Sequence, residues 1–131
     1  MIVIDSSVFS KFLMGESGWE RVLPYLDPNQ KPHAVDLLIV EGMNVIWKYT
    51  KKYRMITRDQ ALGLYERMMK LVKEGVIAVE PGEKYLQDAL KIAINHDISV
   101  YDGLFLAQAK SLKAKLVTGD RKQREVAEML E

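Results

Sequence analysis

The sequence contains no cysteine, which excludes disulfide bonds, thiolate metal sites and cysteine nucleophiles. This absence is typical of a reducing compartment, so we expect a cytoplasmic protein. Proline is also scarce, because its four copies lie only between Pro24 and Pro32 and at Pro81, where they separate elements of structure. No apolar run is long enough to span a bilayer, and the N-terminus shows no basic leader followed by a cleavable apolar core. We therefore expect no membrane partner.

Length and charge are those of an ordinary globular domain. The chain has 131 residues, of which 48% are hydrophobic, enough to fill a single core. We expect one domain over residues 1–131, since no repeat, linker or low-complexity tract divides it. With 19 Lys and Arg against 18 Asp and Glu, the net charge is +1. Any binding of nucleic acid must therefore depend on a local basic patch or on a bound cation.

The hydrophobic pattern predicts strands that alternate with helices. Residues 1–4 form a continuous apolar run that ends at Asp5, which is typical of a strand buried on both faces of a parallel sheet. Further extended segments are expected at 33–35, 76–79 and 115–118. This alternation predicts an α/β fold, a mostly parallel sheet of short strands with helices on both faces. Because ligands bind beyond the carboxyl ends of such strands, Asp5 and Asp120 are expected at one functional edge.

The helices are predicted from apolar spacing and from capping residues. Thr57 and Gln60 form a capping box that opens the clearest of them, which ends at Gly75. The predicted helices cover residues 6–14, 19–26, 37–52, 57–74, a segment around 86–93, 99–112 and 121–130.

Three of the conspicuous acidic residues have a purely structural explanation. Asp5 could cap the helix that follows it, since its carboxylate can accept hydrogen bonds from free backbone N–H groups. Asp102 closes a capping box that begins at Ser99, and Asp120 with Gln123 could cap the last helix. Taken singly, each of these acids is better explained as a cap than as a functional group.

Glu41 interrupts a strongly apolar helix, so it is harder to dismiss. It shares one helical stripe with Asn44, Lys48 and Lys52, and such a stripe is usually a solvated face. If the stripe instead lines a cleft, Glu41 would face a metal ion there. A basic track for phosphates would then continue along Lys48, Lys51, Lys52, Arg54 and Arg58.

Taken together, the four acids favour a metal site. Carboxylates gathered at one edge would repel one another unless a cation lay between them. Only oxygen ligands are available near these acids, so the expected ion is Mg²⁺ or Mn²⁺. Zinc is not expected, because His33 and His96 are isolated in the sequence.

Four motifs that run in order along nearly the whole chain resemble those of the PIN-domain nucleases, in particular the VapC toxins of prokaryotic toxin–antitoxin pairs. The motifs are VIDSS at 3–7, IVEGMNV at 39–45, VYDGLFLAQA at 100–109 and LVTGD at 116–120. The resemblance implies a PIN-like domain with catalytic residues at Asp5, Glu41, Asp102 and Asp120. It assigns metal binding to Asp5, Asp102 and Asp120, and supporting hydroxyls to Ser7 and Thr118. Gly103 is unusual in this pattern, since a small helix former is expected there.

The function implied is that of an endoribonuclease, a Mg²⁺- or Mn²⁺-dependent enzyme that hydrolyses RNA phosphodiester bonds. In this hypothesis three aspartates hold the metal, Glu41 orients or deprotonates the attacking water, and Lys48, Lys51 and Lys52 contact the RNA backbone. The resemblance also implies a homodimer and a cognate antitoxin of the VapB type, for which the helix beginning at Thr57 is a candidate surface. Ordinary core packing is the favoured explanation of that helix.

Other classes remain as alternatives. A phosphoacceptor receiver domain requires a second acid beside the first-strand aspartate, and a haloacid-dehalogenase-like phosphatase requires an acid at the position of Ser7. Neither requirement is met. Two alternatives stay open: a non-catalytic PIN-like module that binds RNA or an antitoxin, and an RNA-processing nuclease without a toxin role.

Overall fold

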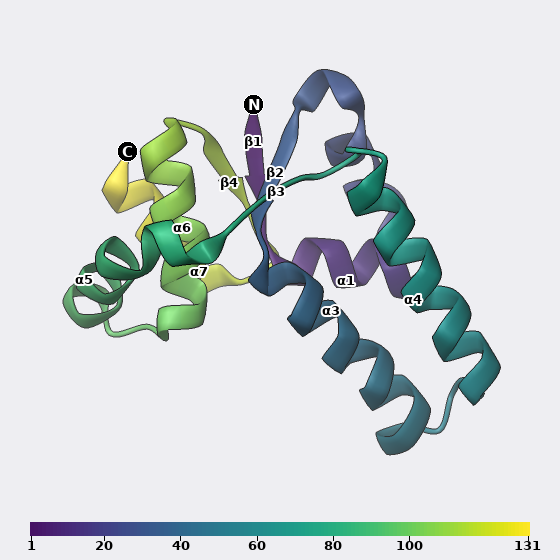
Figure 1. The fold of residues 1–131 in the computed structure, drawn as a ribbon. Helices are drawn as coiled ribbons and strands as arrows, with labels where there is room; N and C mark the ends of the chain where they lie inside the picture. Colours follow the sequence, from purple (N-terminus) through teal and green to yellow (C-terminus); the bar gives the residue numbers. More distant parts are fainter.

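The computed structural model describes residues 1–131 and contains one sheet of four short strands in the order β3-β2-β1-β4. All three strand pairings are parallel, with Val3 opposite His33 on one side and opposite Leu116 on the other. Helices cover both faces: α5, α6 and α7 lie on one side, and α1, α3 and α4 lie on the other (Figure 1). The α/β prediction of a parallel sheet with helices on both faces is confirmed.

The elements follow the predicted alternation along the chain. They are β1 (Ile2–Ile4), α1 (Ser6–Met14), α2 (Trp19–Val22), η1 (Leu23–Leu26), η2 (Pro28–Gln30), β2 (Pro32–Val35), α3 (Leu37–Trp47), η3 (Lys48–Lys52), α4 (Arg58–Lys73), β3 (Ala78–Glu80), η4 (Gly82–Tyr85), α5 (Leu86–His96), α6 (Val100–Leu112), β4 (Lys115–Val117) and α7 (Arg121–Leu130). No helix among them combines the length and the apolar composition needed to cross a bilayer.

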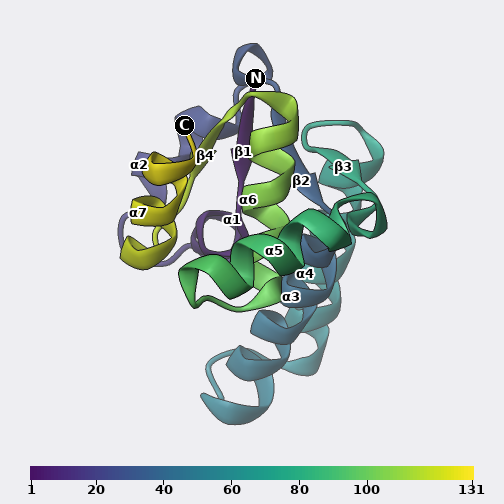
Figure 2. The ribbon, with the colours of Figure 1, turned by 90° about the vertical axis from the view of Figure 1, so that its left-hand side faces the viewer.

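The core lies between the sheet and helices α1 and α6. All three residues of β1 are buried, as the unbroken apolar run predicts for a central strand of a parallel sheet. Phe9 of α1 and Phe105 of α6 are among the largest side chains that are almost completely buried. In the view of Figure 2, α6 runs alongside β1 on the near side of the sheet, α5 crosses in front of its lower part, and α7 lies to the left. These contacts hold the strand ends in fixed positions, and the candidate site is built on those ends.

Three predictions of element bounds are wrong. The helix expected at 19–26 divides into α2 and the 3₁₀ helix η1, whose first turn contains Pro24. The strand expected at 76–79 is formed by Ala78–Glu80, because Val76 still donates to the carbonyl of Leu71 in the turn that ends α4. The helix expected to continue to Lys52 changes at Trp47 into a π-helical turn, η3. There the Thr50 hydroxyl donates to the Ile46 carbonyl at 2.8 Å, a contact that disturbs helical geometry. The capping box of Thr57 and Gln60 is confirmed by both of its hydrogen bonds.

Gly103, unusual in the sequence, lies at a close contact between α5 and α6. A Cβ atom added at Gly103 would come within 2.6 Å of the backbone carbonyl oxygen of Ala89 in α5. Backbone atoms cannot rotate away as a side chain can, so the two helices would have to separate. Glycine is thus required at this position by helix packing, and its low helix propensity is tolerated.

We expect Gly103→Ala to destabilise the fold by about 1–3 kcal/mol, the usual cost of overpacking, less a propensity gain of up to about 1 kcal/mol. Urea unfolding measures this change. Gly63→Ala in α4 is the matched control, because a Cβ at that exposed position meets nothing within 4 Å. The control should be stabilised by about 0.5–1 kcal/mol. Equal effects of the two substitutions would contradict the packing explanation.

Candidate functional site

The candidate site lies at the carboxyl edge of the sheet, between strands that are neighbours in space and far apart in the sequence. Asp5 follows β1, and Thr118, Gly119 and Asp120 follow β4, which pairs with β1. Glu41 comes from α3 on one side of the sheet, and Asp102 from the first turn of α6 on the other. Parallel pairing of β1 with β4 therefore brings Asp5 and Asp120, which are far apart in the sequence, to the same edge.

Asp5 is the most deeply buried acid of the group, with 4% of its surface exposed. Its Oδ1 accepts hydrogen bonds from the Ser7 hydroxyl at 2.6 Å and from the Val8 backbone N–H at 3.1 Å, and its Oδ2 accepts one from Thr118. Burial raises the pKa of Asp5, and these hydrogen bonds oppose the increase only in part. Asp5 is thus both the cap of α1 and a buried carboxyl group whose ionisation is less favourable than that of an exposed aspartate.

Ser7 and Thr118, predicted as supporting hydroxyls, both contact Asp5 and also tie the strand ends to each other. The Ser7 Oγ accepts a hydrogen bond from the Gly119 backbone N–H at 2.9 Å. The Thr118 Oγ1 accepts one from the Asp120 N–H at 3.0 Å. Each hydroxyl donates to a carboxylate and accepts from backbone, which holds Asp5 in one orientation.

Glu41 lies on the side of α3 that faces this cluster. Its Oε1 accepts a hydrogen bond of 2.6 Å from the Ser6 hydroxyl, and its Oε2 accepts none. Burial raises the pKa of Glu41, the Ser6 hydrogen bond lowers it, and the negative charges of Asp102 and Asp5 raise it further. Glu41 also lines a cleft together with Ser6 and Ser7, so its stripe of α3 is not merely a solvated surface.

Asp102 and Asp120 complete the cluster. Burial raises the pKa of Asp102, and the charges of Asp120 and Asp5 raise it further, against a hydrogen bond to Ser99. Asp120 also caps α7, since its Oδ1 accepts from the Gln123 N–H at 2.8 Å. The capping explanation and the clustering of the acids are therefore compatible, because the first turns of these helices begin at the same edge.

Three contributors to this edge were not identified from the sequence. Ser6 holds Glu41, and the fully buried Gln123 donates from Nε2 to the Asp102 carbonyl at 3.3 Å, which ties α7 to α6. Lys11 of α1 lies in the cleft beside Glu41. Ser6 and Glu41 are 35 residues apart, and no local pattern indicates that they meet.

A cleft of about 630 Å³ opens beside Glu41. It is lined by Ser6, Ser7, Ser10, Lys11, Glu16, Leu37, Val40, Glu41, Asn44, Val45, Lys48, Tyr101 and Gly119. Neither Lys11 nor Lys48 forms an ion pair, so both ammonium groups are free to meet an anion. Of the predicted basic track, Lys48 lines the cleft, whereas Lys51 and Lys52 lie beyond it on η3.

The donor set fits a hard divalent cation. It consists of carboxylate and hydroxyl oxygens. Burial raises the pKa of Asp5, Glu41 and Asp102, and a cation would relieve the repulsion that raises the pKa of Glu41 and Asp102 further. No three carboxylate or imidazole groups converge at ligating spacing. A cation would thus be held by one or two carboxylates and by water, which is the usual coordination of Mg²⁺. Neither His33 nor His96 belongs to the cluster, as expected.

Glu80 is an acid at the same edge of the sheet that does not join the cluster. It ends β3, and it accepts hydrogen bonds from Tyr85 Oη at 2.8 Å, from Gln108 Nε2 at 3.0 Å and from Lys84. Burial raises the pKa of Glu80, but these hydrogen bonds outweigh that effect and lower it to about 2. Glu80 is therefore a structural tie between β3 and the helices beside it.

The low pKa of Glu80 predicts a defined pH dependence of stability. Folding favours the ionised form of Glu80. Its contribution to the free energy of unfolding is therefore complete above its ordinary pKa of 4.5 and is lost as the pH falls toward about 2. We expect the free energies of unfolding of the wild type and of Glu80→Gln to differ most above pH 4.5 and to converge below it. Urea unfolding over this range measures the difference, and a constant difference would contradict the prediction.

Comparison with known proteins places this arrangement in a family. The family model of the PIN domain matches residues 2–129. Ribonuclease VapC3 of Pyrobaculum aerophilum is 28% identical over 120 residues, which cover 92% of this chain and 89% of that protein.

The fold is similar to solved structures as well. PAE2754 from Pyrobaculum aerophilum superposes with a TM-score of 0.71 at 19% identity, over 95% of this chain and 78% of that one. FitAcB from Neisseria gonorrhoeae superposes with a TM-score of 0.66 at 22% identity, over 98% of this chain and 94% of that one. Because the family model of the PIN domain matches residues 2–129, almost the whole of this chain, the chain belongs to the PIN domain family.

Proposed function

We propose that this protein is a divalent-metal-dependent endoribonuclease of the VapC type, which hydrolyses RNA phosphodiester bonds. The observation that carries the proposal is the grouping of Asp5, Glu41, Asp102 and Asp120 at one edge of the sheet, where burial raises the pKa of the first three and the charges of neighbouring acids raise that of Glu41 and Asp102 further. Such clustering of acids is unfavourable for folding and is typical of functional sites. The similarity to Ribonuclease VapC3 over 92% of the chain supports a ribonuclease.

Asp5, Asp102 and Asp120 would hold Mg²⁺ or Mn²⁺, directly or through water. Bound there, the cation would lower the pKa of a water molecule and balance the charge that develops on the phosphate. The protein's part is to position these carboxylates. Ser7 and Thr118 hold Asp5 in place, and Gln123 ties the Asp102 carbonyl to α7.

Glu41 would act as the general base. The Ser6 hydroxyl holds Oε1, which leaves Oε2 free to accept a proton from the attacking water. The raised pKa of Glu41 makes it a stronger base than an exposed glutamate, provided that it is ionised at the working pH. Lys11 and Lys48 in the cleft would bind phosphate oxygens beside it, and Lys51 and Lys52 would extend the contact along the RNA.

Incubation of the purified protein with a mixed RNA pool tests the proposal. We expect shortened products with Mg²⁺ or Mn²⁺, and none when EDTA removes the metal. Binding of RNA in both conditions without any product would instead support a non-catalytic module. Cleavage that is equal with and without EDTA would contradict the metal-dependent mechanism.

We further propose a homodimer and a cognate antitoxin of the VapB type, within the cytoplasm. Exposed apolar side chains support such partners: Val40, Met43 and Trp47 on α3, Leu62 and Tyr65 on α4, and Leu86, Leu90 and Ile94 on α5.

Light scattering should give a mass near twice 15.0 kDa at high concentration if the dimer forms. A short antitoxin-like reading frame beside the gene would favour a toxin over an RNA-processing enzyme.

A further inference from the structure

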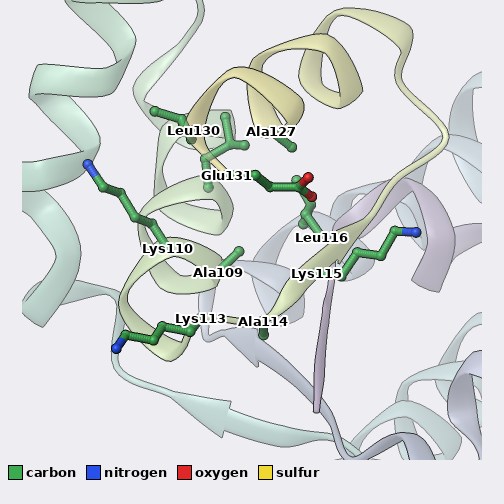
Figure 3. A pocket seen from close by; sticks show the side chains of 10 residues that line it. Ala109, Lys110, Lys113, Ala114, Lys115, Leu116, Ala127, Leu130 and Glu131 are labelled. Carbon is green, nitrogen blue, oxygen red and sulfur yellow. The ribbon is translucent and has the colours of Figure 1, made fainter.

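A second, mainly apolar hollow lies at the opposite edge of the sheet from the acids. It has a volume of about 430 Å³ and is bordered by the end of α6, the start of β4 and the end of α7 (Figure 3). The lining residues are Leu106, Ala109, Lys110, Lys113, Ala114, Lys115, Leu116, Ala127, Leu130 and Glu131. None of these residues belongs to the acidic cluster, so the hollow is separate from the proposed ribonuclease site.

The floor of this hollow is apolar and its margin is basic. Leu106, Ala109 and Leu116 are buried in its floor, although no side chain of the protein fills the space above them. Lys110, Lys113 and Lys115 are exposed around it, and none of them forms an ion pair. Their ammonium groups point outward on different sides, whereas the Glu131 carboxylate lies nearer the centre (Figure 3).

A neighbouring hollow of about 420 Å³ extends this surface across α6. The two hollows share Lys110 and Leu130, and the neighbouring one continues to Lys91 and Asp88 on α5. Together they form a surface, which we call the α6 groove, with one mainly apolar depression, one mainly polar depression, and four lysines against two acids. An extended or helical segment of another protein could follow the α6 groove and contact several lysines in turn.

We propose that the α6 groove is a docking site for an acidic, amphipathic peptide segment of a partner protein. Apolar side chains of the segment would enter the depression above Leu106, Ala109 and Leu116, and its carboxylates would meet the lysines at the margin. A small anion is less suitable, because the ammonium groups diverge and a single carboxylate or phosphate cannot meet them all. RNA is less suitable as well, because its backbone would leave the apolar floor exposed to water.

A synthetic peptide of Glu and Leu residues, arranged to form an amphipathic helix, is the probe for this proposal. We expect saturable binding by fluorescence anisotropy, weaker at high salt. NMR shifts should concentrate at Ala109, Ala114, Leu116 and Leu130. Matched peptides with Lys in place of Glu, or with Ser in place of Leu, should bind at least about tenfold more weakly, because each lacks one of the two complementary features.

Variants of the protein complete the test. The double substitution Lys110→Glu with Lys115→Glu should weaken binding at least about tenfold. Lys70→Glu with Lys73→Glu on α4 changes the net charge equally and should leave binding unchanged. Ala127→Trp, which fills the hollow without a change of charge, should also weaken binding, and thermal melting verifies that each variant is folded.

Several results would overturn the proposal. These are absence of peptide binding, equal weakening by the α4 control, or binding of the Ser-substituted peptide as tight as that of the Leu peptide. An RNA oligonucleotide that shifts the same resonances with comparable affinity would identify the α6 groove as a nucleic-acid surface instead.

Discussion

Asp5→Asn is expected to abolish metal-dependent RNA cleavage, with a loss of at least about 10²–10³-fold, while the protein stays folded. Asparagine caps a helix about as well as aspartate, so the hydrogen bond to the Val8 N–H can be kept. What is lost is the negative charge that a cation would meet, together with the acceptor for the Thr118 hydroxyl, which can donate to Gln123 Oε1 instead. Initial cleavage rates with Mg²⁺, measured on one RNA for both proteins, give the change.

The stability of Asp5→Asn should separate a functional role from a structural one. Because the folded state raises the pKa of Asp5, ionisation of this group costs stability as the pH rises through the interval from 3.8 to the folded value. At neutral pH without metal, the variant should therefore melt at the same temperature as the wild type or higher. Mg²⁺ should stabilise the wild type more than the variant, since a ligand of the folded state raises its melting temperature.

The control for this comparison is Asp59→Asn, which changes an exposed acid on α4 in the same way. It should leave cleavage and the response to Mg²⁺ unchanged. Full activity of Asp5→Asn would refute the assignment of the site. Loss of folding in that variant would show instead that the carboxylate of Asp5, with its hydrogen bonds from Ser7 and Thr118, is needed chiefly for stability.

Glu41→Gln is expected to lower the cleavage rate by about 10²-fold or more, the range of a lost general base. Glutamine still accepts the hydrogen bond from Ser6 but cannot take a proton from water. The response of the melting temperature to Mg²⁺ should persist, since Glu41 is outside the proposed metal-binding set. This combination distinguishes a base from a metal ligand.

Ser6→Ala is the companion variant, because it leaves the Glu41 carboxylate intact and removes only the hydrogen bond that orients it. A smaller loss of rate than in Glu41→Gln is expected. The pH profile should also shift, since that hydrogen bond lowers the pKa of Glu41. A variant Glu41→Gln that cleaves at the wild-type rate would exclude a role for Glu41 in proton transfer.

The sequence alone was sufficient for the elements and for the position of the two strand-end aspartates. Apolar runs as short as residues 2–4 predict strands of a parallel sheet, and the carboxyl ends of parallel strands share an edge. Capping patterns located Thr57, Ser99 and Asp120 at helix starts, since these hydrogen bonds form within three residues. Boundaries that depend on pairing with another strand, such as that of β3, were misplaced.

Only the tertiary structure decided how the acids relate to one another and to their supports. Glu41 could belong to a solvated stripe or to a cleft, and the packing of α3 against α1 decides for the cleft. The contact of Ser6 with Glu41, the tie from Gln123 to Asp102 and the requirement for Gly103 all join distant segments. Local patterns record which conformation a segment prefers, whereas contacts between distant segments depend on how those segments pack.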